Sequence, residues 1–257
     1  MIASFQGIHH SYGDKEVLKD ISLNLYSGEI LCVLGPSGCG KTTLLNILSG
    51  AVEPSGGEVL NRSERLSYVF QEDRLLPWRT VFENIHIVDP LSRASRVDAL
   101  IEAVELGGFE NYMPDALSGG MRQRVSIARG FFYPAELMLL DEPLKSLDYC
   151  LRLKMISHIY QLARKTDKAL VFVTHGIDEA LLIADRIVVL SKSPSVVIDE
   201  FELKTLQKER SLGTDEMIEA KRRIVEQLEG RGGIGENPQF RPEAGSLLFR
   251  HTVQPRT

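Results

Sequence analysis

A glycine-rich segment in the first fifth of the chain has the residue types and spacing that bind phosphate. It reads Gly35-Pro36-Ser37-Gly38-Cys39-Gly40-Lys41-Thr42-Thr43. This run fits the pattern G-x-x-x-x-G-K-[ST], which a chain of this size matches by chance roughly one time in a hundred. Glycines let backbone N–H groups converge on a polyphosphate, Lys41 adds a full positive charge, and the Thr42 hydroxyl can ligate Mg2+. The sequence therefore predicts a nucleotide-binding site.

Two further groups of polar residues follow apolar runs. The run 137–140 leads directly into Asp141 and Glu142, and the run 169–174 leads into His175. Core strands of open α/β sheets deliver acids to a metal and phosphate site in this way, at their carboxyl ends. We expect these side chains to meet beside the glycine-rich segment.

A second anion-binding helix start is expected at 117–124, which reads Leu-Ser-Gly-Gly-Met-Arg-Gln-Arg. Here Ser118 and two glycines precede a helix that we expect to run to Arg129. The N-terminus of a helix exposes unpaired backbone N–H groups and the positive end of the helix dipole, and both favour an anion.

The elements that must position these residues alternate between strands and helices. The run Ile30–Leu34 has the continuous apolar character of a buried parallel strand, and Lys41–Ser49 is predicted to be a helix closed by Gly50. A further helix is expected over 148–165. Alternating strands and helices predict an α/β fold with a mainly parallel sheet.

Smaller parts surround this core. Phe5–Tyr12 and Glu16–Leu25 predict a small antiparallel β cap, whereas helical periodicity predicts an inserted helical subdomain over about 72–133. We place the nucleotide-binding domain at 1–203 and a C-terminal accessory helix with a mobile tail at 204–257. In that helix Thr214 is the expected N-cap, and Met217, Ile218, Ile224, Val225 and Leu228 are expected to share one side.

Bulk composition narrows the function. A formal net charge of -5 over 257 residues argues against a large nucleic-acid footprint, which requires a concentrated basic face. Cys32, Cys39 and Cys150 have no spacing for a metal site or a disulfide framework and suggest a reducing cytosol. No apolar run approaches the ~20 residues that span a bilayer.

Taken in order, these motifs resemble the ATP-binding subunit of ATP-binding-cassette (ABC) transporters from about Phe5 to Phe201. The stretch 117–124 is the most specific part, because other P-loop ATPases and kinases lack it. The resemblance implies a P-loop NTPase core, ATP and Mg2+ as ligands, and ATPase activity.

The resemblance also implies a role for each matching residue. Tyr12 would stack on adenine, and 35–43 would wrap the phosphates. Thr42 and Gln71 would ligate Mg2+, with Asp141 acting through water. Glu142 would be the general base, and His175 the switch residue that contacts the γ-phosphate.

In the family, the serine-glycine turn completes the site of the opposite subunit. Ser118, Gly119 and Gly120 would therefore act in trans within a head-to-tail dimer of this chain, and Asp148 would communicate across the interface. The resemblance further implies separate permease subunits, an indirect extracytoplasmic solute-binding protein, no nucleic acid, and a peripheral place on the cytoplasmic face of the inner membrane.

The run 70–78 is similar to the nitrate, sulfonate and taurine importer branch, which includes carriers of pyrimidine precursors. Leu76 and Trp78 would then lie near the permease, although local packing is an equal alternative. Gly176 and Leu144-Lys145 depart from the family pattern, which puts the turnover rate in question. The alternative function is a soluble cassette ATPase acting on nucleic acid or ribosomes.

Overall fold

A six-stranded sheet carries the residues predicted to bind phosphate. We describe residues 1–61 and 63–230 from a computed structural model. The strand order is β5-β6-β7-β3-β8-β9, with β5 (Leu66–Val69), β6 (Leu137–Asp141), β7 (Ala169–Thr174), β3 (Ile30–Leu34), β8 (Arg186–Leu190) and β9 (Val197–Glu202). All neighbours pair parallel except β8 and β9. The predicted mainly parallel sheet is confirmed.

Both faces of this sheet are covered, which explains why its strands are continuously apolar. On β3, Ile30, Cys32 and Leu34 enter one core with the larger helices, whereas Leu31 and Val33 enter a second core with α1 (Lys41–Ser49) and the cap strands. Successive side chains of a strand point to opposite faces, so one short strand anchors two cores.

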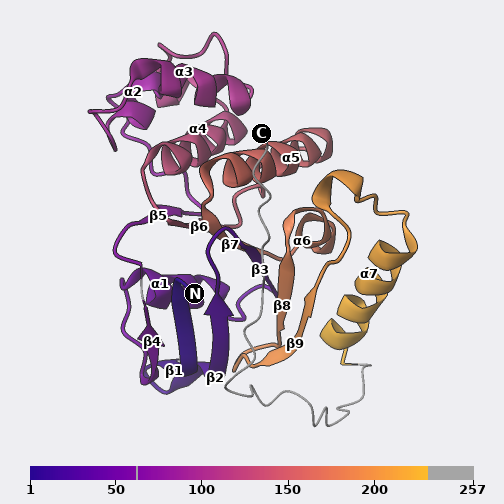
Figure 1. The fold of residues 1–257 in the computed structure, drawn as a ribbon. Coiled ribbons are helices and arrows are strands. Elements are labelled where there is room, and N and C mark those ends of the chain that lie inside the picture. Colours follow the sequence, from indigo (N-terminus) through magenta and orange to yellow (C-terminus); the bar gives the residue numbers. More distant parts are fainter. Residues whose placement is uncertain (62, 231–257) are drawn as a thin grey trace, which may run out of the picture.

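The antiparallel cap has three strands, in the order β2-β1-β4: β2 (Lys15–Leu25), β1 (Ala3–Tyr12) and β4 (Gly56–Leu60). The sequence predicts β1 and β2 as its hairpin, and β4 joins them through an antiparallel pairing with β1. Figure 1 shows this small sheet beside α1, at the end of the molecule opposite α3. It thus covers the helix that follows the phosphate loop.

Helices α2 (Val81–His86), α3 (Ala94–Ala103) and α4 (Gly119–Phe132) gather at the opposite end, with a short 3-10 turn at Pro114–Ala116. Within the predicted helical subdomain, α3 stops at Ala103 because Glu105 takes a left-handed φ of 55°. The predicted end of α4 at Arg129 is too early, because the helix runs to Phe132. Within 72–133, strand structure is absent from the described chain.

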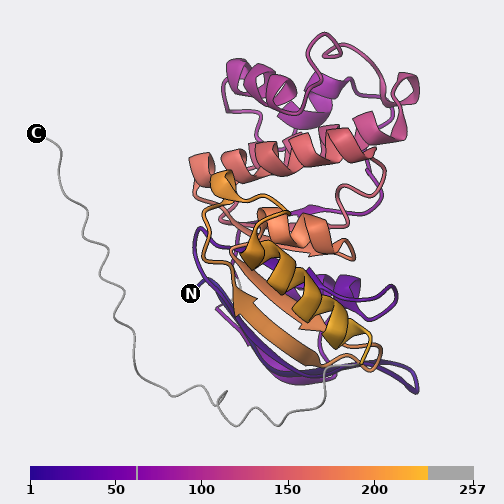
Figure 2. The same cartoon turned by 90° about the vertical axis from the view of Figure 1, so that its right-hand side faces the viewer.

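Two further helices, α5 (Tyr149–Thr166) and α6 (Ile177–Ile183), share one core with α2–α4, on the sheet face opposite α1. The C-terminal α7 (Asp215–Leu228) lies beside α6 and β9, as the rotated view in Figure 2 shows. The prediction for its buried side is wrong at Ile218, which is 54% exposed, whereas Met217, Ala220 and Ile224 are buried. Thr214 is the N-cap residue, as predicted, but its hydroxyl donates to the Ser211 carbonyl and accepts no hydrogen bond from the first turn of the helix.

Part of the expected mobile tail, 231–257, lies outside the described residues. Within the described part of the chain, no helix is both long enough and apolar enough to cross a membrane.

Candidate functional site

The loop between β3 and α1 is shaped by glycines with left-handed backbone conformations. Gly38 has φ 75° and Gly40 has φ 103°. A Cβ atom at Gly40 would lie 2.8 Å from both Leu18 Cδ2 and Val17 Cγ1. Any other residue there would meet both an unfavourable φ and a steric clash. Glycine at this position lets the loop pack tightly against β2.

Lys41 places its charge inside this loop. Its side chain is nearly buried, and Nζ donates to the carbonyl oxygens of Gly35 at 2.8 Å and Pro36 at 3.0 Å. Hydrogen bonds to backbone carbonyl oxygens hold the buried ammonium in one position and offset part of the cost of removing it from water. The loop therefore presents a fixed cation to an incoming phosphate.

Thr42 and Asp141 meet at the carboxyl edge of the sheet. The Thr42 hydroxyl donates to Asp141 Oδ2 at 2.7 Å. Asp141 is only 3% exposed, its Oδ1 atom is buried without a hydrogen-bond partner, and burial raises its pKa. A hydroxyl beside a carboxylate with a free oxygen suits Mg2+, which favours oxygen ligands and keeps several waters.

A different kind of metal site has no support in 1–61 and 63–230. No group of three or more His, Cys, Asp or Glu side chains there could hold an ion. The donor set at Thr42 and Asp141 is accordingly too small for a protein-only cage, and it fits a cation that arrives with nucleotide phosphates.

Glu142 and His175 form a pair beside this edge. Glu142 Oε1 lies 3.1 Å from His175 Nδ1, and the Glu142 N–H donates to the Val173 carbonyl at 3.0 Å. Glu142 has φ 44°, a conformation unusual for a residue other than glycine. Burial acts to raise the pKa of Glu142, but the hydrogen bond and charge of His175, with Lys145 and Lys41, outweigh it and lower that pKa.

Gln71 follows the end of β5 and is exposed. Because Val69 pairs with Leu140, the residues after β5 leave the sheet at the same edge as Asp141. Three side chains of α4 hold the backbone or side chains of the segment around Gln71. Gln123 Nε2 donates to the Phe70 carbonyl at 3.2 Å, Arg122 Nε to Asp73 Oδ2 at 2.8 Å, and Arg129 Nη2 to the Asp73 and Arg74 carbonyls at 3.2 and 3.1 Å.

Ser118 is the N-cap of α4, and its Oγ accepts the Met121 N–H at 3.2 Å. Ser118 and Gly119 are exposed. Among the described residues, no hydrogen bond or ion pair joins 118–120 to 35–43. The fold thus brings Lys41, Thr42, Asp141 and Glu142 together, but the serine-glycine turn forms no bond with these residues.

The serine-glycine turn packs instead against the loop before α5. A Cβ atom at Gly120 would lie 2.8 Å from Leu147 Cδ2, so glycine permits this contact. Asp148 caps α5, its Oδ1 accepting the Leu151 N–H at 3.0 Å. The prediction started α5 at Asp148, one residue before its first helical residue.

Tyr12 lies at the end of β1 with 52% of its surface exposed. Its ring meets His10 edge-on, with centroids 4.7 Å apart. About half of the side chain is therefore available for contact with a planar ligand.

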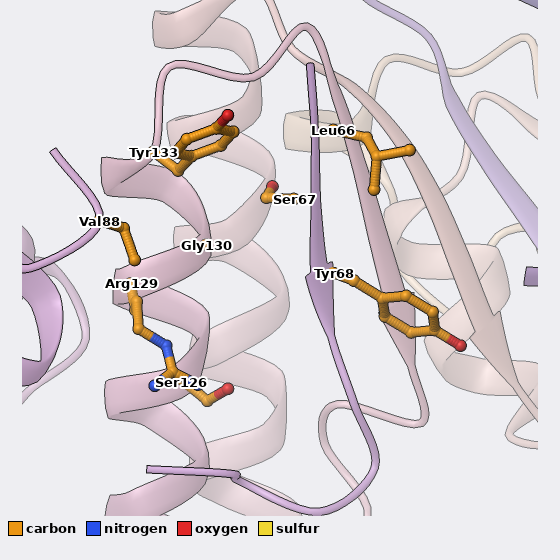
Figure 3. A pocket seen from close by; sticks show the side chains of 8 residues that line it. All are labelled: Leu66, Ser67, Tyr68, Val88, Ser126, Arg129, Gly130 and Tyr133. Carbon is orange, nitrogen blue, oxygen red and sulfur yellow. The ribbon is translucent and has the colours of Figure 1, made fainter. Parts of the chain in front are cut away.

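A separate recess lies between β5 and the C-terminal half of α4. Figure 3 shows Ser67 and Tyr68 on the strand side, with Arg129 and Tyr133 on the helix side and Val88 from the loop after α2. It contains none of the predicted phosphate or metal residues, so it is distinct from the site above.

One charged residue at the site has no role in the sequence prediction. Lys145 Nζ lies 3.4 Å from Glu142 Oε2. The i,i+3 spacing of the two residues was the available signal, because Pro143 favours the second position of a β-turn, which brings the first and fourth residues together.

Comparison with known proteins agrees with this geometry. The family described as ABC transporter matches residues 18–145. The aliphatic sulfonates import ATP-binding protein SsuB 1 of Pseudomonas savastanoi pv. phaseolicola is 44% identical over 191 residues, 74% of this chain and 81% of that protein. SsuB 1 of Shouchella clausii is 36% identical over 231 residues, 90% of this chain and 92% of that protein.

Among solved structures, a dimeric post-hydrolysis state of the ATP-binding cassette MJ0796 bound to ADP and Pi has a TM-score of 0.71 and 30% identity. It covers 79% of this chain and 100% of the cassette. The fold, the phosphate-binding loop and these similarities lead to one assignment: the chain belongs to the ABC transporter family, as an ATP-binding subunit that couples ATP hydrolysis to transport.

Proposed function

We propose that the chain is the ATP-hydrolysing subunit of an importer for aliphatic sulfonates, working through separate permease chains. Relatives that match over most of their length carry that printed function. Nitrate, taurine and pyrimidine precursors are the competing solutes of the same branch. The Glu142–His175 pair at 3.1 Å, beside the Thr42–Asp141 pair, is the observation on which the hydrolytic role depends most.

Each residue has a distinct task in this proposal. Lys41 neutralises charge on the β- and γ-phosphates, and the 35–43 backbone wraps them. Glu142 accepts a proton from water as the water oxygen attacks the γ-phosphorus and ADP leaves. His175 contacts the γ-phosphate and orients Glu142 through its Oε1 atom. Such transfers depend mainly on positioning and charge neutralisation.

The chain also has residues suited to hold Mg2+. Thr42 and Gln71 would bind it directly and Asp141 through water, consistent with the unpartnered Asp141 Oδ1. When bound, Mg2+ supplies charge neutralisation on the phosphate oxygens.

A second copy would complete the site. Ser118, Gly119 and Gly120 lie at the N-terminus of the 14-residue helix α4, where solvent reaches them. They would bind the triphosphate held by the partner. Tyr12 would stack on the adenine, and Asp148 would lie at the loop between the two sites. The dimeric MJ0796 structures support this arrangement by similarity.

Glu142→Gln tests the hydrolytic role. We expect at least a roughly hundredfold loss of hydrolysis, because the amide cannot accept the proton. ATP binding should be retained, and a nucleotide-bound dimer should accumulate in size-exclusion chromatography. Glu136→Gln, one residue before the N-terminal end of β6, is the control and should hydrolyse ATP at the rate of the parent chain. Normal hydrolysis by Glu142→Gln would exclude the proposed base.

The permease would contact the helical end of the molecule. Trp78 is 69% exposed, so local packing, the alternative for this side chain, does not account for it. The recess in Figure 3 lies at the junction of the sheet and α4 and is a second candidate for this contact. The subunit would then sit peripherally on the cytoplasmic face of the inner membrane.

Transport in proteoliposomes tests the solute. Proteoliposomes that contain the chain, its permease and the solute-binding protein should take up ethanesulfonate when ATP is enclosed in their lumen. Nitrate and taurine uptake under the same conditions would favour the other members of the branch. Nuclease-sensitive association of the chain with nucleic acid would support the soluble cassette alternative, which the importer relatives make less favourable.

A further inference from the structure

The carboxylate of Glu142 is held from two sides by residues of different loops. His175 Nδ1 lies 3.1 Å from Oε1, and Lys145 Nζ lies 3.4 Å from Oε2. Oε2 is buried and accepts no hydrogen bond from a described residue, so the Lys145 ammonium is its nearest charged partner. Each carboxylate oxygen of Glu142 thus faces a partner of its own.

The backbone places Lys145 firmly while leaving its side chain free. The Lys145 N–H donates to the Glu142 carbonyl at 3.3 Å, and the Leu147 N–H donates to the Leu144 carbonyl at 3.2 Å. Leu144 and Leu147 are buried and anchor this turn, whereas the Lys145 side chain is 54% exposed. The ammonium can therefore leave Glu142 without any change in the fold.

Other charges near Glu142 are already committed. Lys41 Nζ is bonded to the loop carbonyls of Gly35 and Pro36, and the Asp141 Oδ2 atom accepts from Thr42. Lys145 is thus the cation at this carboxylate that belongs neither to the phosphate loop nor to the histidine turn.

We propose that Lys145 restrains Glu142 through this ion pair and so lowers the basal rate of ATP hydrolysis; the proposal rests on the proposed role of Glu142 as the base. A general base must direct a free lone pair at its water, and the ion pair opposes the required reorientation. Partly exposed ion pairs are weak, so the restraint corresponds to roughly a twofold to fivefold change in rate.

Lys145→Met tests the restraint, because it removes the charge and keeps most of the side-chain length. In the absence of permease, kcat for Mg-ATP should rise roughly two- to fivefold while KM for ATP stays unchanged. Lys145→Arg keeps the charge and should retain the parental kcat. Lys154→Met is the matched control, because Lys154 is similarly exposed and its Nζ lies 3.3 Å from Glu105 Oε1, and it should also retain the parental kcat.

The double variant Lys145→Met with Glu142→Gln should be as inactive as Glu142→Gln alone. An unchanged or lower kcat in Lys145→Met, or an equal rise in Lys154→Met, would overturn the restraint while leaving the proposed function intact. Parental hydrolysis by Glu142→Gln would instead overturn the proposed function itself.

Discussion

The two regions that we propose to bind the phosphates of ATP differ in how they are completed. The phosphate loop at 35–43 is surrounded by its own chain, with Lys41 nearly buried and Thr42 bonded to Asp141. In the serine-glycine turn at 118–120, Ser118 and Gly119 are exposed and Gly120 is half-buried, and among the described residues its hydrogen bonds stay within its own helix. The first region is preorganised by the sheet, whereas the second offers N–H groups that meet no anionic side chain of the described residues.

This difference has a physical cause. The phosphate loop joins the central strand β3 to α1, so two hydrophobic cores fix its ends. The turn begins α4 and is held through Leu147 and through the arginines that reach the Gln71 segment. Movement of α4 would therefore carry the turn and the residues around Gln71 together.

Lys41→Ala should have the largest effect of these substitutions, a loss of ATP affinity that arises in the preorganised region alone. Loss of charge-assisted hydrogen bonds to phosphate is expected to weaken ATP binding roughly tenfold to a hundredfold, as measured by isothermal titration calorimetry. The exposed Lys165→Ala on α5 is the control. Undiminished affinity in Lys41→Ala would show that the loop binds phosphate without its buried cation.

Ser118→Ala should have an intermediate effect, confined to hydrolysis. We expect roughly tenfold slower turnover, from one lost hydrogen bond to the partner's nucleotide, and unchanged ATP affinity in the dilute chain. Thr80→Ala removes the equivalent N-cap of α2, where Thr80 Oγ1 accepts the Glu83 N–H at 3.2 Å. Because each cap contributes ~1 kcal/mol to stability, this control separates the cap from the trans contact.

An equimolar mixture of Lys41→Ala and Ser118→Ala chains sharpens the comparison further. A mixed dimer has one site with both an intact Lys41 and an intact Ser118, so ATP hydrolysis should exceed that of either variant alone. Absence of any rise, with mixed dimers verified by differential tagging, would mean that the two regions do not combine across chains.

Arg122→Met should have the smallest effect. It removes the partly exposed bond from α4 to Asp73 and a second bond to the Leu117 carbonyl, and should lower the free energy of unfolding by ~1–2 kcal/mol without changing ATP affinity. The urea midpoint measures this loss. Arg222→Met, which breaks pairs with Glu219 and Glu226 on the exposed side of α7, should leave the midpoint unchanged. A drop in ATP affinity would show that α4 and the phosphate loop are coupled within one chain.

Some features could be predicted from the sequence because they depend on local patterns. The bounds of β3 and α1 match the prediction, since an apolar run, a glycine turn and a terminal Gly50 define them without tertiary context. At α7 the same reasoning misassigned Ile218. Periodicity alone gives an apolar stripe, but the part of it that is buried depends on where β9 and α6 lie.

By itself, the sequence determined which residue types are available for phosphate, metal and water: the loop at 35–43, the acids after one apolar strand and the histidine after another. Those are consequences of chemistry and of strand and helix periodicity. Only the tertiary structure decided that Thr42 contacts Asp141, that β4 joins the cap, and that Lys145 faces Glu142. Such contacts join residues through backbone geometry and packing, which no local pattern specifies.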